Sequence, residues 1–171
     1  AAGVPARGRA LIAKLLVDVP NAATSRSLQA GLVWIDAELL LAEGKTREAI
    51  ARFRAAMTGS DGGASGLTPR AYFGIARSFD KAQQPDSAMA YYERYLAIEP
   101  AVRWGGLNDP IALAATQKRL GELYDAKGER TSAIKHYDAF VTQWKDADVE
   151  LQPTVASVKK RLTELRGMEG K

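Results

Sequence analysis

Apolar residues along this 171-residue chain recur at intervals of three and four positions, and no segment alternates apolar and polar residues as a strand would. The clearest series are Ala49, Ile50, Phe53 and Met57; Ala88, Met89, Tyr92 and Leu96; and Ala133, Ile134, Tyr137 and Val141. Each series places one apolar stripe along a helix. The sequence therefore predicts an all-helical protein.

Three segments share one pattern of small and large apolar positions. A small residue is followed after three positions by a large apolar residue, after twelve by alanine and after sixteen by an aromatic residue. The three sets are Ala37, Leu40, Ala49 and Phe53; Ala76, Phe79, Ala88 and Tyr92; and Gly121, Tyr124, Ala133 and Tyr137. Small residues let antiparallel helices approach closely, and the aromatic side chain fills the groove beside the alanine. Each segment is therefore predicted to form a helical hairpin.

Helix-stopping and helix-starting residues separate the two halves of each segment, at Gly44-Lys45, Gln84-Pro85-Asp86 and Gly128-Glu129. We predict hairpins at residues 28–57, 69–99 and 112–144, an N-terminal helix at 6–19 and a capping helix at 153–166, all in one domain over 1–171. Gly-rich connectors at 59–66 and 101–110 separate the hairpins. Longer loops cost little extra free energy, so the hairpin cores stay intact while the angle between hairpins is left open.

This pattern resembles the tetratricopeptide repeat family, in which an aromatic residue, Leu-Gly, Tyr, Ala-x3-Phe and Pro recur over about 34 residues. The second segment supplies Tyr72, Ile75, Ala76, Phe79, Ala88, Tyr92 and Pro100. The third has Gln117 at the opening aromatic position, and the first has Val33 and Asp36 in place of the aromatic residue and the leucine. The resemblance implies a right-handed α-solenoid of three hairpins, with an N-terminal helix and a C-terminal capping helix.

A second resemblance concerns the end of the chain. Trp144-Lys145-Asp146-Ala147-Asp148, then Leu151-Gln152-Pro153 and Arg161-Leu162, are similar to the last repeat of multidomain bacterial proteins. In those proteins such repeats follow a serine/threonine kinase domain or a DNA-binding regulator domain. This resemblance implies a sensing or docking segment of a bacterial regulator.

Candidate catalytic chemistry is sparse. The chain has no cysteine and one histidine, His136, which adjoins the core position Tyr137 and is predicted to face outward or to be partly shielded. A lone imidazole makes a poor metal site. The carboxylates form no pair of the kind that acid–base catalysis uses. We therefore predict no catalytic residue, no metal site, no cofactor and no enzymatic activity.

The net charge of +4 invites a nucleic-acid partner, but its distribution disfavours one. Acidic and basic residues alternate through most predicted helices, and the densest basic run is Lys159-Lys160-Arg161. A surface that follows phosphates needs its charge gathered on one face. No stretch approaches the roughly 18 apolar residues of a membrane span. The sequence leaves the compartment undetermined.

By resemblance, a partner peptide or protein binds the concave face that the first helices of the hairpins line. The residues expected there are Trp34, Glu38, Arg70, Phe73, Arg77, Lys118, Arg119 and Glu122. Aromatic and arginine side chains carry much of the energy of protein interfaces. The alternative is that Trp34 packs against the N-terminal helix and that the charged side chains are merely solvated.

The sequence leaves three functions to consider, and the third, an enzyme of unrecognised type, lacks any identifiable set of convergent polar groups. The first is a non-catalytic scaffold that binds a protein or peptide partner. The second is a structural subunit that self-associates into an oligomer or filament by stacking end to end or side by side, because the end of a repeat stack exposes an apolar surface. The N-terminal helix and the very apolar residues 32–41 are the predicted contact for self-association.

Overall fold

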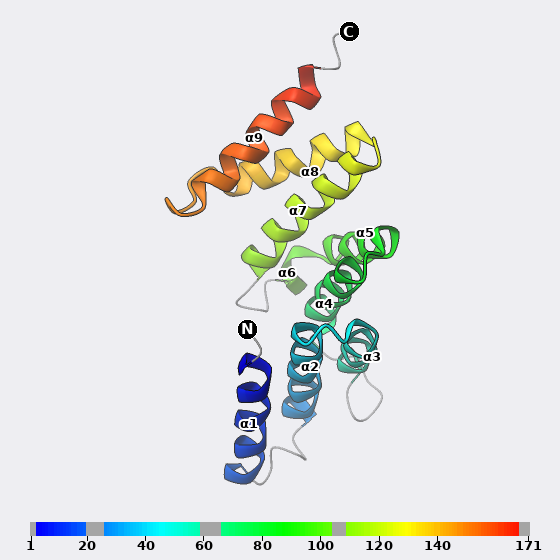
Figure 1. Ribbon diagram of the computed structural model, residues 1–171, viewed down its shortest axis with the longest axis vertical. Helices are drawn as coiled ribbons and strands as arrows, with labels where there is room; N and C mark the ends of the chain where they lie inside the picture. The colour runs from blue at the N-terminus through cyan, green and yellow to red at the C-terminus, as the bar shows by residue number, and fades with distance from the viewer. Residues whose placement is uncertain (1–2, 20–25, 59–65, 104–108, 168–171) are drawn as a thin grey trace. The chain divides into compact units, whose positions relative to one another are not determined.

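In a computed structural model, described at residues 3–19, 26–58, 66–103 and 109–167, the chain is all-helical (Figure 1). The helices in these ranges are α1 (Gly3–Asp18), α2 (Arg26–Ala42), α3 (Thr46–Ala56), α4 (Thr68–Lys81), α5 (Pro85–Leu96), α6 (Pro100–Arg103), α7 (Asp109–Ala126), α8 (Arg130–Gln143) and α9 (Gln152–Gly167). They pack in adjacent pairs, and the predicted helical-repeat fold is confirmed. The predicted connectors fall partly on residues 59–65 and 104–108, outside the described ranges.

The chain divides into two compact units, residues 1–102 and 103–171, with the boundary inside α6. The first unit holds α1 to α5, and the second holds α7 to α9. The assignment of residues 1–171 to one continuous domain stays a prediction. None of the helices in the described ranges combines the length and the apolar character that crossing a bilayer requires.

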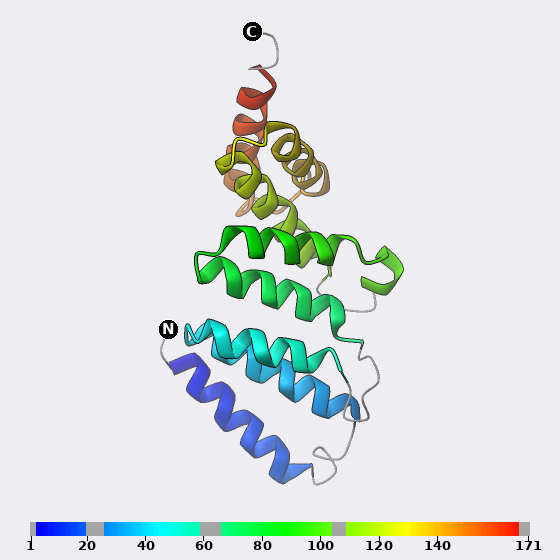
Figure 2. The ribbon, with the colours of Figure 1, turned by 90° about the vertical axis from the view of Figure 1, so that its right-hand side faces the viewer.

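In the first unit, α2 pairs with α3 and α4 pairs with α5, while α3 also packs against α4 and α1 packs against α2. Figure 2 shows the α4–α5 pair layered on the α2–α3 pair. The core joins three helices through Ala37, Leu40 and Leu41 of α2, Ala49, Ile50 and Phe53 of α3, and Ala71 and Ile75 of α4. Fully buried alanines at these contacts allow the close helix approach that the sequence pattern predicts.

In the second unit, α7 and α8 form a hairpin and α9 packs against α8. The apolar stripe of α9, which consists of Val155, Val158, Leu162 and Leu165, joins Ala133, Tyr137 and Phe140 of α8 in one core. Lys159 and Lys160 lie on the exposed side of α9. A terminal helix with one apolar and one polar side covers the open edge of the hairpin, as expected for a capping helix.

The three hairpin turns have the same backbone geometry. Gly44, Gln83 and Gly128 adopt positive φ values of 83°, 56° and 74°. The amide after each of these residues donates to a carbonyl in the last turn of the preceding helix: Lys45 to Leu40 at 2.9 Å, Gln84 to Phe79 at 3.0 Å and Glu129 to Tyr124 at 2.9 Å. This hydrogen bond closes a helix end that stops in the left-handed region. The turns therefore repeat with the same intervals as the alanines of the sequence pattern.

Candidate functional site

Five of the predicted partner-binding residues meet on one surface of the first unit. Trp34 and Glu38 lie one turn apart on α2, and Arg70, Phe73 and Arg77 lie on α4. Residues four apart share a helix face, so each helix presents its members side by side. We call these five residues the α2–α4 face.

At one end of the α2–α4 face, Arg70 covers Trp34. The guanidinium carbon of Arg70 lies 5.6 Å from the centre of the Trp34 ring, within the range of a cation–π contact. The half-buried indole packs against the core of α2, α3 and α4. Its N–H is buried without an acceptor among the described residues. Packing against that core differs from the alternative in which Trp34 packs against the N-terminal helix.

At the other end, Arg77 links the two helices. Its two terminal nitrogens donate to the two carboxylate oxygens of Glu38, at 3.1 and 3.2 Å. The same guanidinium lies 5.3 Å from the centre of the Phe73 ring. Phe73 in turn contacts the rings of Tyr92 and Tyr95, with centroids 6.2 and 5.8 Å away. Arg77 is therefore held in place by a planar ion pair and an aromatic ring.

The other three predicted residues lie on α7 in the second unit. Lys118 and Arg119 both pair with Glu122, and the Arg119 contact measures 2.9 Å. Lys118 and Glu122 also line a cavity of about 610 Å³, together with Tyr137 of α8 and Pro153, Thr154, Ser157, Val158 and Arg161 of α9. We call this the α7–α9 cavity. It brings charged groups from α7 and α9 and the hydroxyls of α9 to one place.

Beside the α7–α9 cavity lies a partly exposed charge network that sequence reasoning missed. Arg161 donates two hydrogen bonds to Asp125, at 2.7 and 2.8 Å, and the Tyr137 hydroxyl lies 3.4 Å from the same carboxylate. The hydrogen bond from Arg161 lowers the pKa of Asp125 below its usual range, against the opposing effect of burial. Burial and the nearby Asp125 carboxylate raise the pKa of Tyr137 to about 12.

His136 is buried, so the prediction that it faces outward or is partly shielded is wrong. Its side chain is 2% exposed, its ring stacks on Tyr124 with centroids 5.4 Å apart, and its Nδ1 lies 2.7 Å from the Gln117 side-chain oxygen. Both contacts lie on α7, so His136 belongs to the hairpin interface together with Tyr137. Gln117, at the position of the family's opening aromatic residue, is the polar partner that makes a buried imidazole tolerable here.

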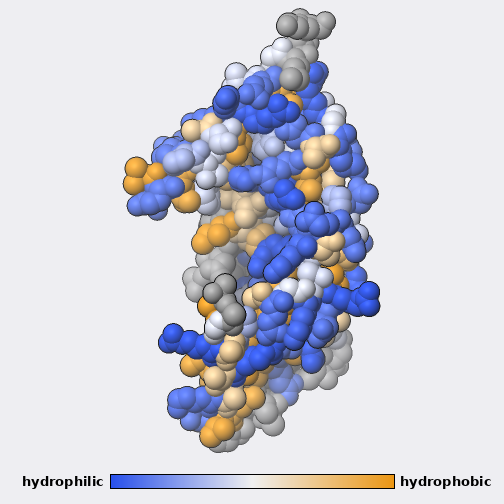
Figure 3. Space-filling view, viewed as in Figure 1, coloured by the Kyte–Doolittle hydropathy of each residue, from blue (hydrophilic) through white to orange (hydrophobic). Residues whose placement is uncertain are grey.

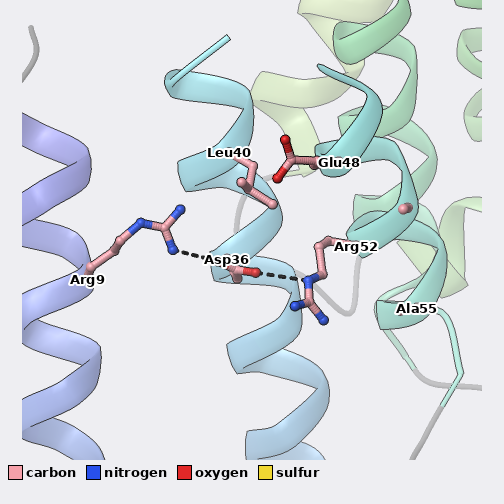
Figure 4. A pocket seen from close by; sticks show the side chains of 7 residues that line it. Arg9, Asp36, Leu40, Glu48, Arg52 and Ala55 are labelled. Carbon is pink, nitrogen blue, oxygen red and sulfur yellow. Dashed lines mark hydrogen bonds and ion pairs between the residues drawn. The ribbon is translucent and has the colours of Figure 1, made fainter. Parts of the chain in front are cut away.

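A second missed cluster lies on the first unit, between α1, α2 and α3. Arg9 donates to Asp36 at 2.7 Å, and Arg52 contacts the other oxygen of the same carboxylate at 3.1 Å (Figure 4). These residues line a cavity of about 520 Å³ with Leu40, Glu48, Ala51 and Ala55. The sequence signal for this cluster was the departure at Asp36, where the repeat pattern has leucine. A carboxylate is tolerated at position 36, between three helices, because Arg9 of α1 and Arg52 of α3 both pair with it.

Groups of three or more His, Cys, Asp or Glu side chains that could hold a metal ion do not occur in the described part of the chain. Residues 70–101, which include most of α4 and all of α5, match the family model of the tetratricopeptide repeat. No curated protein matches the chain at a significant level. Repeats of this family generally mediate protein–protein interactions and are generally not catalytic.

Proposed function

We propose that the chain, which carries a tetratricopeptide repeat at residues 70–101, binds a protein or peptide partner on the α2–α4 face and catalyses no reaction. One observation carries this proposal. The first helix of the matched repeat holds Arg70, Phe73 and Arg77 against Trp34 and Glu38 of the preceding hairpin, so aromatic and cationic side chains form a continuous surface. Such side chains are enriched among the residues that dominate interface energies.

The chemistry of the α2–α4 face favours an acidic partner segment. The face has two arginines and one glutamate, and the Arg77 side chain remains 38% exposed beside Glu38. Carboxylates of a partner can accept hydrogen bonds from Arg70 and from the exposed edge of Arg77. The half-buried rings of Trp34 and Phe73 offer apolar contact between those charges. A nucleic acid would need a larger field of basic charge than this face supplies.

A charge exchange tests the α2–α4 face without removing buried aromatic rings. Arg77→Glu alone places two carboxylates together, whereas the double variant Glu38→Arg with Arg77→Glu rebuilds the ion pair in reverse. The partner is captured from the native source with the unchanged chain, identified by mass spectrometry, purified and titrated calorimetrically. We expect the double variant to keep its urea midpoint and to bind about tenfold or more weakly, as loss of one charged hydrogen bond predicts.

Arg52→Ala is the matched control, because Arg52 forms an ion pair with α2 from the α3 side and lies outside the α2–α4 face. Its affinity for the partner should equal that of the unchanged chain. If the double exchange and the control bind alike, the partner does not use the α2–α4 face.

The α7–α9 cavity is proposed as a further contact for a partner segment in the second unit. Ser157 lines this cavity and is exposed, so Ser157→Trp fills it without breaking the Arg161–Asp125 pair. We expect this variant to weaken binding while the far-ultraviolet circular dichroism stays unchanged. Unaltered affinity would remove the cavity, and with it Lys118 and Glu122, from the proposed interface.

A second candidate function is self-association. The observation that favours it is the exposure of large apolar side chains on α1, including Leu11 at 60% and Val17 at 78%. Soluble monomers rarely leave an extended apolar surface open to water. Sedimentation equilibrium over a range of concentrations tests it, since a monomer would keep the mass of one chain throughout.

A further inference from the structure

Helix α1 is apolar on more than one side. Its exposed apolar side chains are Val4 at 70%, Leu11 at 60%, Leu15 at 38%, Leu16 at 40% and Val17 at 78%. Figure 3 shows apolar surface over α1 on the face seen there. A helix with apolar residues on several sides is normally covered on several sides. In the first unit α1 packs against α2, whereas α3 packs against both α2 and α4.

The contacts between α1 and α2 locate the uncovered stripe. Gly8 faces Leu39, which a Cβ at Gly8 would approach to 2.7 Å, and Arg9 reaches Asp36 on one side of this contact. With 100° of rotation per residue, Leu11 lies on the opposite side of the contact from Arg9. Leu15, seven residues after Gly8, lies at the edge of the contact on that same side and is still 38% exposed. By the same rotation, Leu28 and Ile35 of α2, which are 41% and 37% exposed, lie on that side too. We call these four leucine and isoleucine residues the apolar α1–α2 surface.

The neighbouring helices show what fits on such a surface. The α3–α4 contact resembles the α1–α2 contact, because α3 is the second helix of one hairpin and α4 is the first helix of the next. On this α3–α4 pair a third helix, α2, packs against both members. The α2 residues in that position are apolar or small, namely Ala37, Leu40 and Leu41. By this internal repetition, the apolar α1–α2 surface is a place for one further helix with an apolar stripe.

We infer that the helix on this surface is α1 of a second copy of the chain, so that two copies form a closed, antiparallel dimer. This inference deepens the proposed self-association and is independent of partner binding on the α2–α4 face. α1 has the stripe that the surface requires, in Leu11 and Leu15, and it is also one wall of that surface. In the dimer each α1 covers α1 and α2 of the other copy. Because both copies use the same surface, no such surface is left for a third copy, and the assembly stops at a dimer.

The charges of α1 agree with an antiparallel pairing. Arg7 and Asp18 are exposed, lie eleven residues apart on the same side of α1 and flank the leucine stripe at its two ends. When Leu11 lies opposite Leu15 of the second copy, Arg7 comes beside Asp18 of that copy, twice in the dimer. Asp18 already accepts a hydrogen bond from Lys14 at 2.8 Å, and its carboxylate has further lone pairs for Arg7. A parallel pairing would instead bring like charges together.

Sedimentation equilibrium with matched variants tests the dimer. The unchanged chain should have the mass of two chains, with no larger species as concentration rises. Leu11→Lys with Leu15→Lys should raise the dissociation constant about a hundredfold or more, because two leucines per copy lose their burial. Val17→Lys is the control. It removes an apolar side chain that is more exposed than either leucine but lies off the stripe, and should leave the dimer unchanged.

Disulfide crosslinking tests the antiparallel register, because the chain has no cysteine of its own. A mixture of Leu11→Cys and Leu15→Cys chains should form the mixed disulfide faster than either chain forms a disulfide with itself. A monomeric chain at about 100 µM, far above the concentration at which a specific interface assembles, overturns both the dimer and self-association. Association that survives the double lysine change, or that grows into larger species, overturns the α1 dimer alone.

Discussion

The ring of Tyr137 occupies the space that a side chain at Gly121 would need. A Cβ built on Gly121 would lie 2.4 Å from Cδ1 and 2.6 Å from Cε1 of that ring, far inside normal van der Waals contact. Gly121 stands where the other two hairpins have Ala37 and Ala76, and both alanines are fully buried. The third hairpin therefore uses glycine to bring α7 close against the Tyr137 ring.

Gly121→Ala is expected to destabilise the protein by about 1–3 kcal/mol, the usual cost of overpacking a closed core. This cost exceeds the gain of about 1 kcal/mol that alanine has over glycine within a helix. Urea unfolding measures the change. Gly31→Ala on α2 is the control, because among the described residues no atom beyond its chain neighbours and the α2 backbone lies within 4 Å of its added Cβ, and it should leave the stability unchanged or raise it. Equal midpoints for the two variants would contradict the tight Gly121–Tyr137 contact.

Gln83→Gly is expected to stabilise the second hairpin. Gln83 has a φ of 56°, while the equivalent residues of the other turns are glycines. A residue with a Cβ costs about 1–2 kcal/mol in the left-handed region, and glycine avoids this cost. The expected gain is about 1 kcal/mol in urea unfolding, reduced by the greater freedom of glycine in the unfolded chain. Gly128→Gln should lose a similar amount, and a loss of stability in Gln83→Gly would show that its side chain stabilises the turn.

The small and aromatic positions of the sequence predicted the hairpins well, because each hairpin is a local structure. Ala49, Ala88 and Ala133 are fully buried, as the need for close helix approach requires. The turn positions follow from glycine and proline, whose backbone preferences act within a few residues. These relationships need no knowledge of how one hairpin lies against another.

Contacts between three helices could not be predicted in the same way. Asp36 meets Arg9 and Arg52 from two different helices, and no spacing within one helix encodes such a meeting. Arg161 and Asp125 lie 36 residues apart, on helices whose crossing the periodicity of each leaves open. For His136, the interface with α7 is wide enough to cover two adjacent residues of α8, which a single-stripe pattern does not anticipate. The partner-binding role of the α2–α4 face stays a prediction.

Asp125→Asn is expected to reduce the loss of stability in acid. The Arg161 hydrogen bond lowers the pKa of Asp125 in the folded protein. This interaction therefore stabilises the protein above the unfolded value of about 4, and its contribution is lost as the pH falls through the lower folded value. At neutral pH the variant should lose about 1 kcal/mol, a modest figure because Arg161 is 40% exposed and solvent screens the pair.

Urea midpoints at neutral and acidic pH give the comparison for Asp125. The unchanged chain should lose more stability on acidification than Asp125→Asn does. Asp138→Asn provides the control, since the Asp138–Arg166 pair is 51% exposed on both sides and exposed pairs contribute little. An acid profile that is the same in Asp125→Asn and in the unchanged chain would show that the Asp125 carboxylate is not linked to folding.

Tyr137→Phe is expected to remove a loss of stability at high pH. Burial and the Asp125 carboxylate raise the pKa of Tyr137 to about 12 in the folded protein, while an unfolded tyrosine ionises near pH 10. Between these values the unfolded chain has lost the proton that the folded chain keeps, so stability falls as the pH rises. Urea midpoints between about pH 9 and 11 should therefore fall less steeply in the phenylalanine variant.

The hydroxyl contact with Asp125 is long, at 3.4 Å, so the variant should lose little stability at neutral pH. Equal slopes in the two proteins would mean that the Tyr137 hydroxyl reaches solvent and ionises in the folded state.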